Sequence, residues 1–240
     1  MRRDNVSKAF RPSLAATILL GGLVLAFIGL GNWQLDRAAQ KAAIQQQFDQ
    51  APSFDVLPAP GEVSRYAHVR VAGKYDRQRH FLIDNQLLDG RAGVHVLTPF
   101  ALDDGRTILV NRGWLPLPPD RRSLPAVPTD GSRTELGGQL DEIYRPGRRI
   151  GNPDVLHENT WPQLVTYPAM DDIAAVLGTK VYPLVLKLDA DEPSGFEGRH
   201  WHAVNTGAAK HRARALQWFT FVIAALLIWL YLGFRRGAER

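Results

Sequence analysis

Two apolar runs, one near each end of the chain, restrict most strongly what this sequence can fold into. The first covers residues 14 to 30, and the second covers residues 215 to 234 with only Gln217 and Thr220 as polar interruptions. A helix needs about 20 apolar residues to cross a hydrocarbon core of about 30 Å, and both runs approach or reach that length. We therefore predict a membrane protein in which two transmembrane helices flank a central domain.

Positive charge marks the outer end of each run. Four of the first eleven residues are Arg or Lys, and Arg235 and Arg236 follow the second run. The positive-inside rule then places both termini in the cytoplasm and the central domain in the periplasm, or in the equivalent mitochondrial compartments. The predicted location is a two-pass protein of the cell inner membrane. A cleaved signal peptide is the alternative for the first run, because Gly29 and Gly31 are small residues of the kind found before a cleavage site.

The chain divides into six segments by pattern. We predict a basic cytoplasmic tail (1–13), a first transmembrane helix (14–35), a juxtamembrane helix (36–51), an extracytoplasmic β-rich domain (52–206), a second transmembrane helix with basic residues at its start (207–234) and a cytoplasmic tail (235–240). The juxtamembrane helix is rich in Ala and Gln and is expected to end before Pro52.

The net charge of +5 lies at the two ends of the chain. Residues 1–11 contribute +3 and residues 235–240 contribute +2, so the residues between them are neutral overall. A neutral body offers no basic surface for a duplex, and we expect no nucleic acid among the partners. The chain has no cysteine, which excludes disulfides, thiolate nucleophiles and thiolate metal sites.

Alternating apolar and polar residues predict strands in the central domain. Val69 and Val71 alternate with His68 and Arg70, and similar patterns occur at residues 80–85, 93–100, 107–117, 134–143, 181–189 and, less regularly, 199–204. Turn signals at residues 89–90 and 103–105 separate consecutive strands, and residues 167–178 read as a helix with Gly178 as its C-cap. The predicted fold class is an α+β, mainly antiparallel β domain, either a barrel or a sandwich.

No enzyme signature is present in the sequence. The chain lacks a glycine-rich phosphate loop, an HExxH motif and a nucleophile elbow. The paired carboxylates at residues 103–104 and 171–172 fall in a turn and at a helix start, where acidic residues are common for structural reasons. We predict that the protein is not an enzyme.

His200 and His202 are the nearest approach to a metal site. Residues two apart on a strand point to the same face, so the two imidazoles would form half of a metal site there. An exposed strand face near the membrane is the alternative. A copper-carrier function has little support, since the sequence has no cysteine and only Met1 and Met170 as thioether ligands.

The sequence VNRGW, residues 110–114, ends a predicted strand with a charge, a glycine and a large aromatic ring. Gly113 allows an unusual backbone conformation, and Trp114 is expected to close one end of the core. Arg112 is expected to pair with a carboxylate. A structural role explains this motif.

Basic residues and a histidine crowd the start of the second apolar run in NTGAAKHRARALQWF, residues 205–219. If Asn205 or Thr206 caps the helix, its first two turns carry Lys210, His211, Arg212 and Arg214. Because the N-terminal end of a helix is already positive, this cluster requires an anion. Lipid phosphates are one candidate. The propionates of a haem are another, with His211 as axial ligand to the iron and Trp218 against the macrocycle.

Five motifs resemble, in order and spacing, those of the Surfeit locus protein 1 family of cytochrome c oxidase assembly factors. They are GNWQLDRAAQK (31–41), GVHVLTPF (93–100), VNRGWLP (110–116), PSGFEGRHW (193–201) and KHRARALQWF (210–219). The Trp-Gln-x-x-Arg spacing of the family is present as Trp33, Gln34 and Arg37. These three residues are expected to make structural or partner contacts where the first span meets the second. The resemblance covers nearly the whole chain.

The resemblance implies a chaperone of the respiratory chain that assists delivery of haem a to cytochrome c oxidase subunit I or its insertion there. Bacterial members are linked to haem a binding through a histidine at the head of the second span, here His211. Haem a is then the expected cofactor, with subunit I, haem a synthase and membrane lipids as partners. The family usually has Tyr where this chain has Arg214, which either contacts a propionate or replaces an aromatic packing contact.

A cofactor-free membrane scaffold that tethers oxidase assembly intermediates is the alternative function. In that case His211 would be dispensable, and partner contacts would fall to residues of the outer domain such as Arg112 and Trp114. The spectrum of the purified protein separates the two functions, because only a haem-binding protein has a Soret band.

Overall fold

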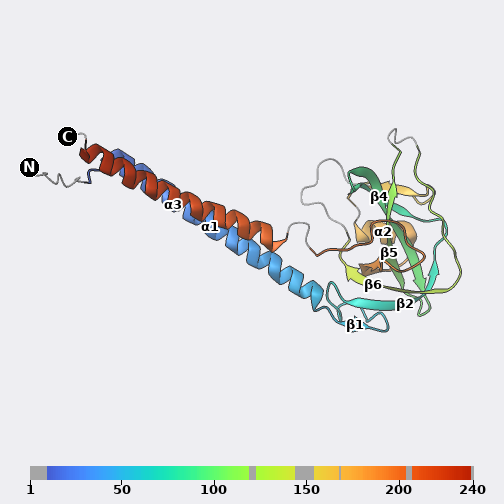
Figure 1. Ribbon diagram of the computed structural model, residues 1–240. Helices are drawn as coiled ribbons and strands as arrows, with labels where there is room; N and C mark the ends of the chain where they lie inside the picture. The colour runs from blue at the N-terminus through green and yellow to red at the C-terminus, as the bar shows by residue number, and fades with distance from the viewer. Residues whose placement is uncertain (1–9, 119–122, 144–153, 168, 204–206, 239–240) are drawn as a thin grey trace, which may run out of the picture. The chain divides into compact units, whose positions relative to one another are not determined.

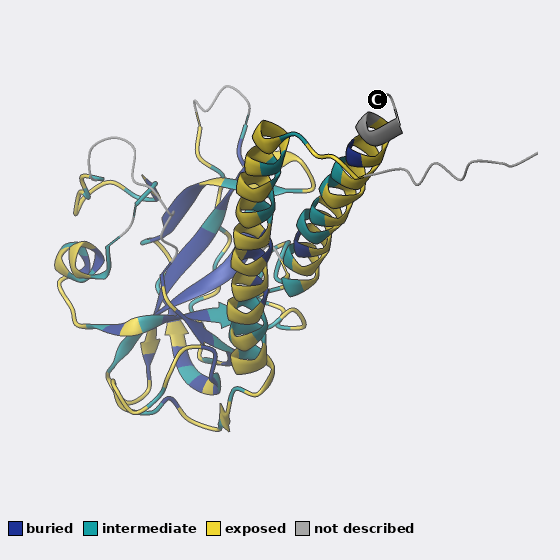
Figure 2. Cartoon of the chain, turned by 90° about the vertical axis from the view of Figure 1, so that its left-hand side faces the viewer, coloured by how far each residue is buried: buried dark blue, intermediate teal, exposed yellow. Residues whose placement is uncertain are grey.

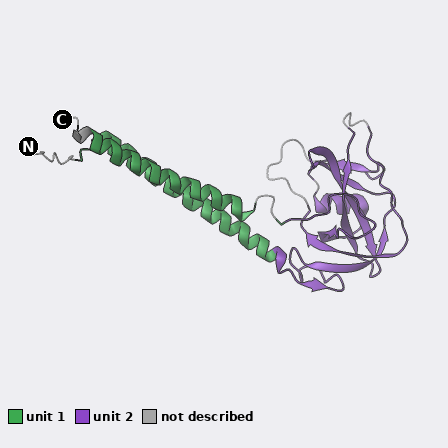
Figure 3. Cartoon of the chain, in the orientation of Figure 1, with its two compact units in different colours: residues 1–47, 203–240 green, residues 48–202 purple. Residues whose placement is uncertain are grey.

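The computed structural model describes residues 10–118, 123–143, 154–167, 169–203 and 207–238 of the 240-residue chain. These residues form two compact units (Figure 3). The first unit contains residues 1–47 and 203–240, and the second contains residues 48–202.

The first unit is a pair of long helices, α1 (Leu14–Asp49) and α3 (Ala208–Ala238), which lie side by side (Figure 1). Both are long and apolar enough to cross a membrane, so this is a two-pass membrane protein. The predicted first transmembrane helix and the juxtamembrane helix are one continuous helix, which ends at Asp49, just before Pro52. Proline explains this end, because it cannot donate the backbone hydrogen bond that a helix requires.

The seam between α1 and α3 follows a heptad spacing. The less exposed positions of α1 recur three or four residues apart at Thr17, Leu20, Val24, Phe27, Gly31, Gln34 and Ala38. Those of α3 recur in the same way at Ala208, His211, Ala215, Trp218, Val222, Ala225 and Trp229. Such spacing keeps one stripe of each helix against its partner, as in a coiled coil.

Side-chain contacts show that the two helices run antiparallel. Trp229 Nε1 donates to Thr17 Oγ1 at 3.1 Å near one end of the pair, and the rings of Phe27 and Trp218 lie 5.6 Å apart further along. The two helices approach so closely at Gly31 that only glycine fits there, because a Cβ would lie 2.7 Å from the Phe219 ring. The aromatic residues of α3 therefore pack directly against the backbone of α1.

Most residues of both helices are exposed (Figure 2), including those of the most apolar stretch of each helix. Leu25 is 73% exposed and Leu216 is 69% exposed, and only 6% of the most apolar window of either helix is buried. A core helix of a water-soluble domain would bury these side chains. Their exposure is consistent with contact to lipid chains.

The second unit is built from eight strands and one short helix. The strands are β1 (Ser53–Phe54), β2 (His68–Tyr75), β3 (Phe81–Leu88), β4 (Arg91–Leu102), β5 (Thr107–Pro116), β6 (Thr134–Asp141), β7 (Gln163–Val165) and β8 (Val181–Leu188), and the helix is α2 (Met170–Leu177). Their order in the sheet is β1-β2-β6-β8-β5-β4-β3-β7, and an additional pairing joins β2 to β4. That pairing closes β2, β6, β8, β5 and β4 into a barrel.

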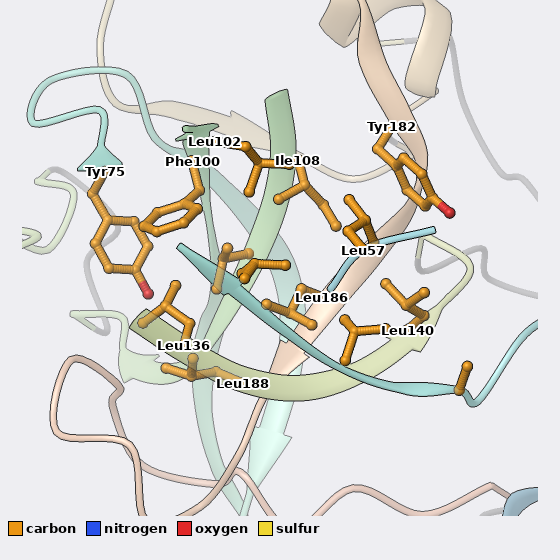
Figure 4. Close-up of a cluster of buried hydrophobic side chains, with 14 residues drawn as sticks. Leu57, Tyr75, Phe100, Leu102, Ile108, Leu136, Leu140, Tyr182, Leu186 and Leu188 are labelled. Atoms are coloured by element: carbon orange, nitrogen blue, oxygen red, sulfur yellow. The ribbon is translucent and has the colours of Figure 1, made fainter. Parts of the chain in front are cut away.

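Three apolar clusters of described residues stabilise the barrel unit, and the smallest contains Leu82, Val94, Val96 and Leu117. Side chains from all five closed strands fill the barrel interior, among them Phe100, Ile108 and Leu186, each with no exposed surface (Figure 4). The second cluster lies on the other side of β5 and β8, where Leu109 and Val185 pack against Ile173 of α2. Alternate residues of β5 and β8 thus face different cores, which explains why these strands are buried on both sides.

The predicted barrel or sandwich is a barrel, and the six clear strand patterns and the one helix are confirmed. Gly178 has φ 65° and caps α2 as expected, and the turns at residues 89–90 and 103–105 connect β3 to β4 and β4 to β5. The predicted strand at residues 199–204 is wrong over 199–203, which have no regular structure, and residue 204 lies outside the described residues. Strands β1 and β7 are not predicted by any pattern in the sequence, because they are only two and three residues long.

Candidate functional site

His211 of α3 faces Gln34 of α1 across the helix seam. The His211 Nδ1 atom and the Gln34 Oε1 atom are 2.8 Å apart. An amide oxygen can only accept a hydrogen bond, so Nδ1 carries the hydrogen and donates it. A neutral imidazole that donates through Nδ1 keeps the lone pair of its other nitrogen, Nε2, available for a ligand.

Small residues on both helices allow this contact. Gly31 and Ala38 lie one turn before and one turn after Gln34, and Ala215 lies one turn after His211; all three are buried. Their size lets the backbones approach closely enough for a glutamine to bridge them. Gln34 is only 7% exposed as a result, whereas its neighbour Trp33 is 50% exposed.

Three cationic side chains surround His211 on α3. Lys210, Arg212 and Arg214 are all exposed, and within the described parts of the chain none of them forms a hydrogen bond or ion pair through its side chain. Lys210 and Arg214 are four residues apart and so share one flank of the helix, while Arg212 lies on the other. The cluster therefore offers positive charge on both sides of the histidine.

The start of α3 is described from Gly207 onward. The backbone N–H of Lys210 donates to the Gly207 carbonyl at 3.2 Å, which forms the first turn. The predicted capping residues Asn205 and Thr206 lie outside the described residues. The cations and His211 occupy the first two turns, as the sequence predicts.

Aromatic rings lie further along the same seam. Trp218 is seven residues beyond His211, which is about 10 Å along the helix axis. Its ring lies 5.6 Å from that of Phe27 and 5.8 Å from that of Phe221. This cluster places apolar aromatic rings, tilted relative to one another, two turns from the imidazole.

The three residues of the Trp-Gln-x-x-Arg motif separate into two groups. Arg37 lies 5.6 Å from the Trp33 ring and donates to Gln40 Oε1 at 3.0 Å, so Trp33 and Arg37 contact each other on the exposed side of α1. Gln34 alone of the three faces α3. The motif is visible in the sequence, but the hydrogen bond between Gln34 and His211 is not predicted by it.

Arg112 of β5 is buried and has neutral partners. It is 3% exposed and donates to the Ser194 carbonyl at 2.8 Å, to Thr129 Oγ1 at 2.7 Å and to the Pro128 carbonyl at 3.0 Å. Its guanidinium also lies between two rings, 4.8 Å from Tyr75 and 4.6 Å from Phe196. The prediction of a carboxylate partner for Arg112 is wrong, because the groups that it donates to among the described residues are two carbonyls and a hydroxyl. The loops supply carbonyl dipoles and π faces in its place, and burial lowers the pKa of Arg112.

The remaining residues of the VNRGW motif make contacts within the barrel unit. Trp114 is 1% exposed and donates through Nε1 to the Gln86 carbonyl at 3.2 Å. Gly113 has φ 105°, and a Cβ there would lie 2.5 Å from the Glu197 carbonyl oxygen. The motif therefore attaches the segment around Phe196 and Glu197 to the barrel.

His200 and His202 lie in an irregular segment, and both are exposed. Trp201 between them is the anchored residue, because its Nε1 donates to the Leu188 carbonyl at 2.8 Å. In the portions of the chain that the structure describes, no group of three His, Asp or Glu side chains is placed to hold a metal ion. Because residues 199–203 form no strand, strand geometry does not place these two histidines on one face.

We expect His95 of β4 to make the free energy of unfolding depend on pH. Burial, and secondarily the charge of Lys187, lowers its pKa from 6.5 to about 4, and its Nδ1 accepts from Asn111 Nδ2 at 3.4 Å. The unfolded chain binds this proton more readily, so the stability contribution is complete above pH 6.5 and is lost as the pH falls toward 4. The loss is at most about 3 kcal/mol. Chemical unfolding at pH 7.0 and 4.5 should show it, and His95→Asn should reduce the difference.

A sequence profile of the SURF1 family matches residues 22–223 of the chain. The SURF1-like protein of Caenorhabditis briggsae is 25% identical over an alignment that covers 95% of this chain and 78% of that protein. The SURF1-like protein of Monosiga brevicollis is 26% identical, with 88% and 85% covered. Surfeit locus protein 1 of Homo sapiens is 24% identical, with 97% and 82% covered. These alignments extend across both helices and the barrel.

Proposed function

This chain belongs to the SURF1 family, which implies a role in cytochrome c oxidase assembly, and we propose that it fulfils this role by binding haem a at His211 for delivery to subunit I. Family members are assembly factors, and no reaction is required of the protein in this function. The observation that carries the proposal is the hydrogen bond from His211 Nδ1 to Gln34 Oε1, which leaves Nε2 free to bind iron.

The residues around His211 fit a haem in their chemistry. A neutral imidazole nitrogen is a common axial ligand to haem iron. Lys210, Arg212 and Arg214 are exposed cations suited to two propionates, and the dipole at the start of α3 adds to their positive field. Trp218 and Phe27 supply an apolar aromatic surface for the macrocycle. Haem itself would contribute the iron and the two carboxylates that these groups recognise.

In this function the residues of the protein bind haem, orient it and release it. His211 holds the iron from the start of α3, and the cations hold the carboxylates near the membrane surface where the helix begins. We place both termini in the cytoplasm and the barrel on the periplasmic side of the inner membrane, on the basis of the charged tails. In this orientation His211 lies at the outer surface. Haem a synthase and subunit I are the proposed donor and acceptor.

Co-expression with the enzymes of haem a synthesis tests the proposal. The protein purified in detergent should show a Soret band, and the pyridine haemochrome spectrum should identify haem a. A dialysed preparation should contain iron in proportion to the haem and no copper.

Two results would count against the proposal. A wild-type protein that supports oxidase assembly without a Soret band would favour the cofactor-free scaffold. Stoichiometric copper after dialysis would favour a copper carrier.

A further inference from the structure

We propose that Gln34 is the positioning residue for His211: it selects the ring tautomer and makes the ligand geometry depend on the pairing of α1 with α3. This inference rests on the proposed function of His211 as an iron ligand. The observation behind it is the 2.8 Å contact between His211 Nδ1 and Gln34 Oε1, which joins residues 177 positions apart in sequence.

The tautomer argument follows from the chemistry of the two side chains. A neutral imidazole carries its hydrogen on one nitrogen, and the partner of that nitrogen decides which one. In metal sites the nitrogen that does not bind metal usually donates to a carboxylate, a backbone carbonyl or water. Gln34 supplies the equivalent acceptor here from a side-chain amide. Nε2 is thereby left as the nitrogen that binds iron.

Burial makes the partnership strong. Gln34 lies in the apolar seam at 7% exposure, where an unpaired amide oxygen would lose the hydrogen bonds that water gives it. His211 is half-buried beside it, and within the described residues its ring has no other hydrogen-bond partner. Each side chain therefore satisfies the other, and the imidazole is restrained from the opposite helix.

The position of the acceptor has a consequence for assembly. Because Gln34 is on α1 and His211 is on α3, the ligand orientation exists only while the two spans are paired. Gly31 and Ala38 on either side of Gln34 keep the backbones close enough for this contact. Helix pairing and haem affinity should therefore change together.

The tautomer can be measured without haem. In apo-protein reconstituted in nanodiscs with ¹⁵N-labelled histidine, ring nitrogen shifts should report the Nδ1–H form for His211, assigned by the signal that disappears in His211→Ala. Gln34→Leu should move the signal toward the Nε2–H form. Gln40→Leu is the matched control, since Gln40 is an exposed glutamine of α1 that contacts Arg37, and it should leave the signal unchanged.

Haem-loaded protein gives the second measurement. Gln34→Leu should weaken haem affinity about 10- to 100-fold, the usual effect of removing such a partner from a metal ligand, and should therefore speed haem transfer to apomyoglobin. Gln34→Glu keeps an acceptor and adds negative charge, so it should retain haem and shift the midpoint potential to more negative values. Gln40→Leu should match the wild type in both measurements.

The two experiments separate this inference from the proposed function. An Nε2–H tautomer in wild-type apo-protein, or equal haem transfer from Gln34→Leu and wild type, would overturn the positioning role even if haem binds. Equal haem transfer from Gln34→Glu and Gln34→Leu would also overturn it. Glutamate keeps a hydrogen-bond acceptor and leucine does not, so equal behaviour would mean that the acceptor has no effect and that Gln34 has only a structural role. The correct tautomer in a protein that takes up no haem would instead overturn the proposed function.

Discussion

Replacing His211 with alanine is expected to remove the Soret band from the purified protein. His211 is the only histidine in the first unit, so no other imidazole of the described helix pair can take its place. Loss of an iron ligand should reduce affinity by more than the roughly 10- to 100-fold typical of losing its hydrogen-bond partner. The measurement is the haem-to-protein ratio after co-expression with haem a synthesis.

The matched control for this result is His202→Ala. His202 is an exposed histidine in an irregular segment, so its removal should leave the haem-to-protein ratio at the wild-type value. Circular dichroism should show the same helix content in both variants. Equal haem content in His211→Ala and wild type would rule out ligation by this residue.

Removing single positive charges near His211 should weaken haem binding by a smaller amount than removing His211 itself. Arg214 lies on the same flank of α3 as Lys210, and both are exposed. If they hold propionates, Lys210→Ala and Arg214→Ala should each weaken haem binding without abolishing it, and high salt should reduce the difference from wild type. Arg214→Tyr introduces the residue that the family resemblance leads us to expect there and distinguishes a propionate contact from an aromatic one.

The local elements of this fold could be predicted because local signals determine them. Apolar length indicated α1 and α3, and two-residue alternation indicated the six main strands. The two-residue β1 and three-residue β7 are too short for any period to register. The alternating sequence HWH led to the predicted strand over residues 199–203. In the structure Trp201 donates a hydrogen bond to the Leu188 carbonyl and is not part of a strand. Barrel closure between β2 and β4 depends on tertiary register, which no local pattern encodes.

The candidate site was predictable only on one of its two helices. Cations next to a histidine at a helix start are visible in sequence, so His211 and its neighbours could be identified. Gln34 could not be assigned to His211, because the match requires the register of an antiparallel pair separated by a whole domain. One feature of the sequence could have indicated that Gln34 faces α3: it is a polar residue at a heptad position of α1, between the small residues Gly31 and Ala38.

Arg112→Ala is expected to destabilise the barrel unit strongly. The change leaves the Ser194 and Pro128 carbonyls and Thr129 Oγ1 without their donor and removes the cation from between Tyr75 and Phe196. Unpaired buried acceptors and lost cation–π contacts together should lower the free energy of unfolding by about 3 kcal/mol or more. Chemical unfolding of the full chain, followed by near-UV circular dichroism, measures this loss.

The variants around Arg112 distinguish its geometry from its charge. Arg112→Lys keeps the positive charge, but a single ammonium cannot reproduce the planar fork that reaches Ser194, Thr129 and Pro128, so it should recover only part of the stability. Arg133→Ala is the control, because Arg133 forms an exposed ion pair with Asp103 that should be worth less than about 1 kcal/mol. Full recovery by lysine would show that charge alone is needed there. An alanine variant as stable as Arg133→Ala would show that the two loops hold together without the guanidinium.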